Sequence, residues 1–147
     1  MPSFVFYLIA GVLGAFAMSI GRVIAHRYIP KFPDMPLLLG RLVDWGKPEP
    51  ESVARIFGNY QHLSMGALWG VLFGALVDKQ FFFAEFNIAQ GVIFSIIPWL
   101  FMMLVLMPLA KRGFFGIKIS GYWWFASLAL HILYGAALGL LLSYMIG

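Results

Sequence analysis

The sequence predicts an all-α, polytopic membrane protein whose four transmembrane helices form two pseudo-symmetric hairpins. Composition gives the class, because 62% of the 147 residues are hydrophobic and only 11% are charged, whereas a soluble domain has about 25% charged residues. The apolar residues also gather in four long segments, and one membrane span needs about 20 of them. We therefore expect a single transmembrane four-helix domain over residues 1–147.

The four predicted spans cover about residues 4–25, 56–77, 88–110 and 122–146. The first differs from a cleaved signal peptide, because no basic segment precedes it and its apolar stretch exceeds the usual ~7–15 residues. In the third span Pro98 can kink the helix, and the adjacent Trp99 would fill a gap in the bundle.

The basic residues predict the orientation of the spans. Nine of the ten Lys and Arg residues lie in or beside the loops at 26–55 and 111–121, and only Lys79 lies between the second and third spans. Because basic loops stay on the cytoplasmic side, we expect both loops to be cytoplasmic at the inner or plasma membrane and both termini to lie outside. Arg22, about one turn inside the first span, can reach the inner surface. The net charge of +4 thus serves topology and contact with anionic lipid, and no nucleic-acid partner is expected.

The inner loop at 26–55 is the only substantial segment predicted outside the membrane, and its five prolines disfavour long helices at its ends. Its middle, residues 35–45, combines leucines with Arg41 and Asp44. Two interpretations stay open for it, a short helix lying in the inner membrane surface or a loop packed over the end of the bundle. His26, at the inner boundary, is expected to anchor the interface.

A stripe of small residues with one histidine occurs twice, in the second and fourth predicted spans. Its members are four residues apart, so each copy forms a slanting ridge that drifts by about 40° per step. Small residues on such a ridge allow close helix crossings. Aligning the two histidines superposes two hairpins related by an axis along the membrane normal. The copies are Gly58, His62, Gly66, Gly70, Gly74 and Ser127, His131, Gly135, Gly139, Ser143.

His62 and His131 are the ionisable side chains well inside the predicted spans, where such residues indicate function. Three interpretations stay open. Each imidazole can hydrogen-bond a neighbouring helix and stabilise the bundle. The pair can ligate the iron of a haem, or each can hold another tetrapyrrole. An imidazole can also donate to a quinone or lipid carbonyl or relay a proton. The glycines that would leave room for a macrocycle are Gly66, Gly70, Gly135 and Gly139.

Other chemistry lacks a pattern in this chain. Without cysteine there are no disulfides, thiolate metal sites or cysteine nucleophiles. The sequence has no P-loop, dinucleotide fingerprint or HExxH zinc motif, and no nucleophile elbow surrounds Ser64 or Ser127. The acidic residues Asp78 and Glu85 fall in the predicted outer loop, so no embedded carboxylate is available to couple a cation gradient. We therefore name no catalytic residue.

The segments 62–70 (HLSMGALWG) and 131–139 (HILYGAALG) share the motif His-x-x-x-Gly-x-x-x-Gly. In this motif, in size and in having several spans, the chain resembles small uncharacterised prokaryotic inner-membrane proteins, including the YagU-like group. The resemblance implies a polytopic membrane protein and no particular activity.

Together these features favour a non-enzymatic binding or accessory subunit of a larger membrane complex, redox or photosynthetic in kind, over a stand-alone enzyme. Such a subunit would hold a haem or another tetrapyrrole at His62 and His131. Its partners would be the lipid bilayer and other membrane subunits or further copies of itself. The alternative is a small-solute or proton transporter whose site lies between the two hairpins.

Overall fold

The computed structural model describes residues 3–29, 32–42 and 50–147, and this part of the chain is helical without strands. The all-α prediction is therefore confirmed for the described residues. The elements, in chain order, are α1 (Ser3–Tyr28), α2 (Met35–Gly40), α3 (Glu51–Asp78), α4 (Ile88–Phe101), the π-helical η1 (Met102–Leu106), α5 (Met107–Leu109), the 3-10 turn η2 (Phe114–Gly116) and α6 (Trp123–Ile146).

Three helices in the described residues are long and apolar enough to cross a membrane. They are Ser3–Tyr28, the continuous stretch Ile88–Leu109, and Trp123–Ile146, and they match three of the four predicted spans. The helix α3 is also long, but its first half carries Asn59, Gln61 and His62, and it is not among the three.

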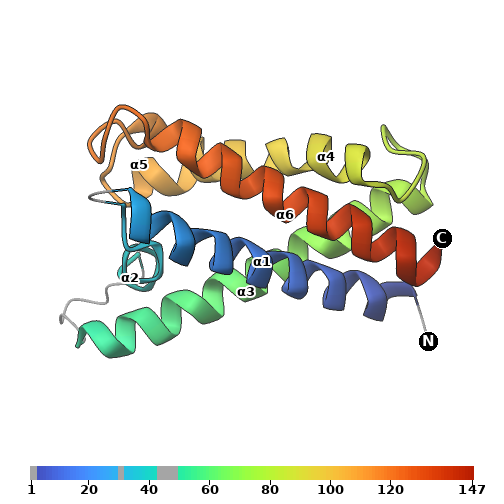
Figure 1. Cartoon of the computed structure of the whole chain (residues 1–147), viewed down its shortest axis with the longest axis horizontal. Coiled ribbons are helices and arrows are strands. Elements are labelled where there is room, and N and C mark those ends of the chain that lie inside the picture. Colours follow the sequence, from blue (N-terminus) through green and yellow to red (C-terminus); the bar gives the residue numbers. More distant parts are fainter. Residues whose placement is uncertain (1–2, 30–31, 43–49) are drawn as a thin grey trace.

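The helices lie lengthwise in a bundle in which α1 packs against α3, α4 against α6, and α1 against α6 (Figure 1). The start of α1, the end of α6 and the loop between α3 and α4 lie at one end, whereas α2, α5 and η2 lie at the other. From the loop that joins them, α3 and α4 diverge toward the end that holds α2, and they barely touch.

Glycines bring α1 and α3 into close contact. A Cβ atom on Gly11 would collide with the carbonyl oxygen of Gly66, and one on Gly70 would lie 2.5 Å from the carbonyl oxygen of Tyr7. A Cβ atom on Gly66 would lie 2.5 Å from the Cβ atom of Ala15. Because a backbone cannot yield as a side chain can, this crossing requires residues without side chains.

The contact between α4 and α6 has the same construction. A Cβ atom on Gly91 would collide with the carbonyl oxygen of Gly135, and one on Gly139 would collide with that of Asn87. A Cβ atom on Gly135 would lie 2.7 Å from the Cβ atom of Ser95. Gly91 and Ser95 therefore take, in this hairpin, the places of Gly11 and Ala15 in the other. The likeness ends between the hairpins, since α1 packs on α6 while the equivalent contact of α4 with α3 is nearly missing.

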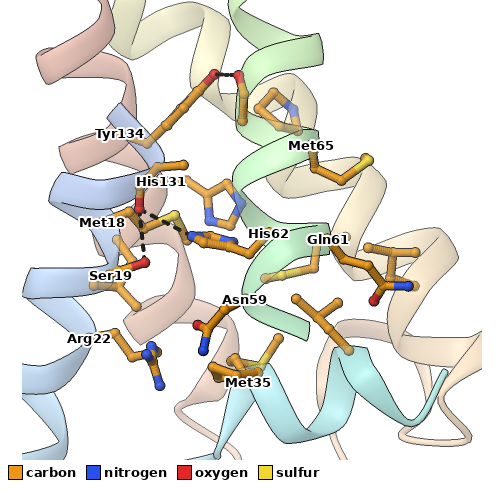
Figure 2. A pocket seen from close by; sticks show the side chains of 18 of the residues that line it. Met18, Ser19, Arg22, Met35, Asn59, Gln61, His62, Met65, His131 and Tyr134 are labelled. Atoms are coloured by element: carbon orange, nitrogen blue, oxygen red, sulfur yellow. Dashed lines mark hydrogen bonds between the residues drawn. The ribbon is translucent and has the colours of Figure 1, made fainter. Parts of the chain in front are cut away.

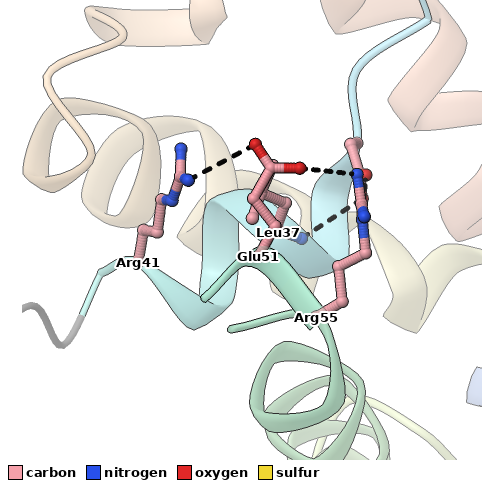
Figure 3. Close-up of polar contacts among 5 residues, drawn as sticks. Leu37, Arg41, Glu51 and Arg55 are labelled. Carbon is pink, nitrogen blue, oxygen red and sulfur yellow. Dashed lines mark hydrogen bonds and ion pairs between the residues drawn. The ribbon is translucent and has the colours of Figure 1, made fainter. Parts of the chain in front are cut away.

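The segment folds as the short helix α2, which packs on the first turns of α3. It thus has the helix of one interpretation and the packing of the other. The side chain of Asp34 caps α2 by accepting from the Leu37 N–H at 3.2 Å and pairs with Arg55 at 2.7 Å. The Glu51 carboxylate forms ion pairs with the guanidinium groups of Arg41, at 3.6 Å, and Arg55, at 3.4 Å (Figure 3). The predicted helix over 35–45 is shorter in the structure, where α2 ends at Gly40, and its part at 43–45 lies outside the described residues.

Burial of the Asp34 carboxyl on its own raises its pKa. The hydrogen bonds from Arg55 and the Leu37 N–H outweigh this effect, so the pKa of Asp34 lies below its ordinary value. The carboxylate form is therefore the one that holds α2 against α3.

Pro98 lies inside α4, as predicted, and the helix changes character shortly after it. Proline has no N–H to donate, which removes one helical hydrogen bond, and the chain continues as the π-helical segment η1 from Met102. Trp99 is 9% exposed and its Nε1–H donates to Ser127 Oγ of α6 at 3.1 Å. Trp99 thus fills space between α4 and α6 and ties them together.

Candidate functional site

A cavity of about 760 Å³ occupies the α2 end of the bundle, where α3 and α4 have separated. Side chains from α1, α2, α3, α4, η1, α5 and α6 line it. Most of the wall is apolar and rich in methionine and aromatic residues, with a small number of polar groups among them (Figure 2). Its apolar lining includes Met18, Met35, Met65, Trp69, Phe101, Met102 and Leu106.

His131 lies on α6, is 7% exposed and lines this cavity. Its Nδ1 is 2.8 Å from the carbonyl oxygen of Ser127, one turn earlier. A carbonyl oxygen can only accept, so Nδ1 carries the proton, and in the neutral ring Nε2 is left as an acceptor. Among the described residues, none hydrogen-bonds this second nitrogen.

His62 lies on α3 and reaches across to α1. Its Nε2 is 3.3 Å from the carbonyl oxygen of Ala15, so it donates there and leaves Nδ1 as the acceptor. Ser19 donates to the same carbonyl at 3.0 Å. Figure 2 shows the rings of His62 and His131 next to each other in the wall of the cavity. The two histidines that the repeat singled out therefore belong to one site.

Tyr134 closes the deep end of the cavity. Its hydroxyl donates to the carbonyl oxygen of Gly66 at 2.8 Å and so links α6 to α3, which share little other contact. At the opposite end lie Arg22 and Asn59, beside α2 (Figure 2). Gln61 also lines the cavity, and its buried Oε1 has no partner among the described residues.

Three of the four glycines expected to make room for a macrocycle lie outside the cavity. Gly66 lines the cavity, but Gly70, Gly135 and Gly139 do not. The space beside those three is filled by the backbone of the neighbouring helix. This differs from the expectation, and the reason is that a missing side chain is taken up by helix packing before a ligand can use it.

Sequence reasoning undervalued Arg22 and Tyr134. The sequence predicts Arg22 only at the membrane surface, whereas the structure places it in the lining of the cavity. Tyr134 follows His131 by three residues and therefore shares its face of the helix, which is the signal that points to it. The hydroxyl of Tyr134 donates to the Gly66 carbonyl and not to either histidine.

The described residues contain no group of three or more His, Asp or Glu side chains that suits a metal ion. This finding concerns ions held by several side chains and does not bear on a haem held by one or two histidines.

The whole chain, residues 1–147, matches a group described as a family of unknown function (DUF6789). Neither a curated protein nor a solved structure matches it. The resemblance to the YagU-like group stays a prediction, because the match does not address it. The chain thus belongs to the DUF6789 family, whose function is unknown.

Proposed function

We propose that this chain is a non-enzymatic integral membrane protein that binds one largely apolar small molecule in the cavity between its hairpins. One observation carries the proposal. In a mainly apolar cavity of about 760 Å³, two adjacent imidazoles each have one nitrogen tied to a backbone carbonyl and the other left as an acceptor.

The size and lining of the cavity support a small-molecule ligand. Pockets that hold a drug-sized molecule have volumes of about 300–1,000 Å³ and a mostly apolar wall with a few placed polar groups. The lining residues Phe57, Tyr60 and Leu109 are 50%, 69% and 68% exposed. They lie on α3 and α5, so the cavity opens toward the surface that lipid would cover, and an apolar ligand can enter from the bilayer.

The proposal includes α3 as a fourth span, which makes two hairpins of two helices. Its 28 residues exceed the ~20 needed to cross. Asn59, Gln61 and His62, which lower its apolarity, line the cavity. The matched glycine crossings of α1 with α3 and of α4 with α6 support descent from a duplicated hairpin.

A tetrapyrrole is the second candidate ligand, favoured by the hydrogen bond that orients the His131 ring. Histidines that bind metal commonly donate their other ring nitrogen to a backbone carbonyl, as His131 does to Ser127. A bound tetrapyrrole would supply redox or light-absorbing chemistry. His131, oriented by its hydrogen bond to Ser127, would hold the group, and the apolar side chains of the cavity would surround it.

The test is whether a small molecule stays with the protein during purification in a mild detergent. Native mass spectrometry should detect one bound molecule per chain. The variant Met65→Trp, which enlarges a cavity-lining side chain of α3, should lose it, and Leu68→Trp should retain it, because Leu68 is 62% exposed on the same helix. A Soret absorption band would identify a tetrapyrrole. An empty wild-type protein, or equal occupancy in both variants, would contradict the proposal.

A further inference from the structure

Arg22 lies where the apolar cavity meets a second, smaller one. The smaller cavity, of about 230 Å³, is lined by polar and charged side chains that include His26, Asp34 and Arg55. Both cavities are lined by Arg22, Pro36 and Asn59. Figure 2 shows Arg22 and Asn59 together at the α2 end, with His62 and His131 farther in. The binding space is therefore apolar along most of its length and cationic at one end.

Arg22 is half-buried, and it forms neither a hydrogen bond nor an ion pair with the residues that the structure describes. The carboxylate that faces the same space is Asp34, which influences Arg22 only through its longer-range charge. Asp34 is already engaged, since Arg55 lies 2.7 Å from it and the Leu37 N–H caps onto it at 3.2 Å. Arg55 therefore takes up the Asp34 carboxylate, and also pairs with Glu51 at 3.4 Å, which leaves Arg22 without a carboxylate of its own among the described residues that line the smaller cavity.

A cation partly withdrawn from water needs an anion or polar partners, because burial of an unpaired charge is costly. A guanidinium group matches carboxylate and phosphate oxygens with two parallel hydrogen bonds. The Asn59 amide can add a third donor from the facing helix. The methionines beyond it suit a flexible hydrocarbon chain, because their side chains adapt to irregular shapes.

We propose that the ligand is a single-chain amphiphile with an anionic head, whose carboxylate or phosphate sits on Arg22 and Asn59 while its hydrocarbon chain lies in the cavity beside His62 and His131. This rests on the proposed function and names the chemical class of the ligand. One chain is inferred because the cavity has the volume of a site for one drug-sized molecule.

The experiment measures saturable binding of tritiated oleate to the full chain in mild detergent, with unlabelled competitors. Oleate and monooleyl phosphate should displace the label, whereas oleyl alcohol should need at least tenfold higher concentration. The ratio of the displacing concentrations of oleate and monooleyl phosphate shows whether the site prefers a carboxylate or a phosphate. Arg22→Gln should weaken oleate binding at least tenfold, as expected for charge-assisted hydrogen bonds. Arg22→Lys should recover part of the loss.

The matched control is Arg27→Gln, on the same helix but exposed and outside both cavities, which should bind oleate like the wild type. If oleyl alcohol competes as well as oleate, the anionic head is refuted, and Arg22 serves only lipid headgroups at the surface. If both probes bind equally and Met65→Trp abolishes both, the cavity proposal stands while this inference fails. Absence of any oleate binding by the wild type also overturns it.

Discussion

The glycine crossing of α1 with α3 makes the sharpest prediction about stability. In Gly11→Ala the new methyl group would meet the carbonyl oxygen of Gly66 and lie 3.0 Å from the Cα atom of Ala67, both parts of the backbone of α3. Neither atom can rotate away, so the two helices must separate along their whole contact. The matched control is Gly21→Ala on the same helix, whose methyl group would meet only side-chain ends, with Leu133 Cδ2 at 2.7 Å.

The expected magnitudes follow from these contacts. Overpacking costs about 1–3 kcal/mol, and an obstruction made of backbone places Gly11→Ala at the upper end. Alanine is favoured over glycine inside a helix by about 0.5–1 kcal/mol, which leaves a net loss of about 2 kcal/mol. In Gly21→Ala a small rotation of Leu133 relieves the contact, so we expect no loss or a gain of up to ~1 kcal/mol. The two variants should therefore differ by about 2–3 kcal/mol.

Unfolding by sodium dodecyl sulfate in mixed micelles, followed by circular dichroism, measures this difference. If the hairpins are equivalent, Gly91→Ala should cost as much as Gly11→Ala, because its methyl group would meet the carbonyl oxygen of Gly135 in the same way. Equal stability of the Gly11 and Gly21 variants would refute the reasoning, since it would mean that α1 and α3 do not cross at this glycine.

Two further predictions concern the ends of the cavity. Tyr134→Phe should lower stability by about 1–2 kcal/mol, because it removes the buried hydrogen bond that links α6 to the Gly66 carbonyl of α3. Tyr144→Phe, at a position 91% exposed, should be neutral in the same unfolding assay, and equal losses would contradict the assigned bond. The pKa of Asp34 is lowered in the folded state, so its contribution to α2 docking is fully present above the unfolded value of about 3.9 and is lost as the pH falls through the lower folded value. A spin label on Leu38→Cys should gain mobility only in that acidic range, and mobility that rises at higher pH instead would show that other groups hold α2.

Much of the helical arrangement follows from local sequence. Three of the predicted spans coincide closely with helices, because an apolar run of about 20 residues is typical of a helix long enough to cross a membrane. The second predicted span was placed at 56–77, whereas α3 begins at Glu51. Residues 51–55 are polar or charged at three positions and gave no apolar signal, yet they form helix because α2 packs on them.

The site was only half predictable, and the glycines show why. A stripe of small residues indicates that another group packs closely against the helix. The sequence does not show whether that group is the backbone of a neighbouring helix or a ligand. The space beside Gly135 and Gly139 is filled by α4. The cavity lies instead beside Met65 and Met102, which carry full side chains. That cavity exists because α3 and α4 diverge, and divergence depends on contacts between distant segments that no local pattern encodes.

The two halves of the bundle also show how a repeat can yield a single site. His62 donates to Ala15 on the neighbouring helix, while His131, its counterpart, donates to Ser127 on its own helix. The residue matching Ala15 is Ser95, and Trp99 one turn later inserts between α4 and α6 to reach Ser127. Trp99 bonds the hydroxyl of Ser127, whereas His131 bonds its backbone carbonyl. Both imidazoles therefore line the cavity, but the first is tied across to α1 and the second within α6. The matched glycines thus give the two hairpins the same crossing. The side chains around the two histidines are not matched, so the histidines make different contacts. This difference accounts for one shared cavity in place of two equivalent sites.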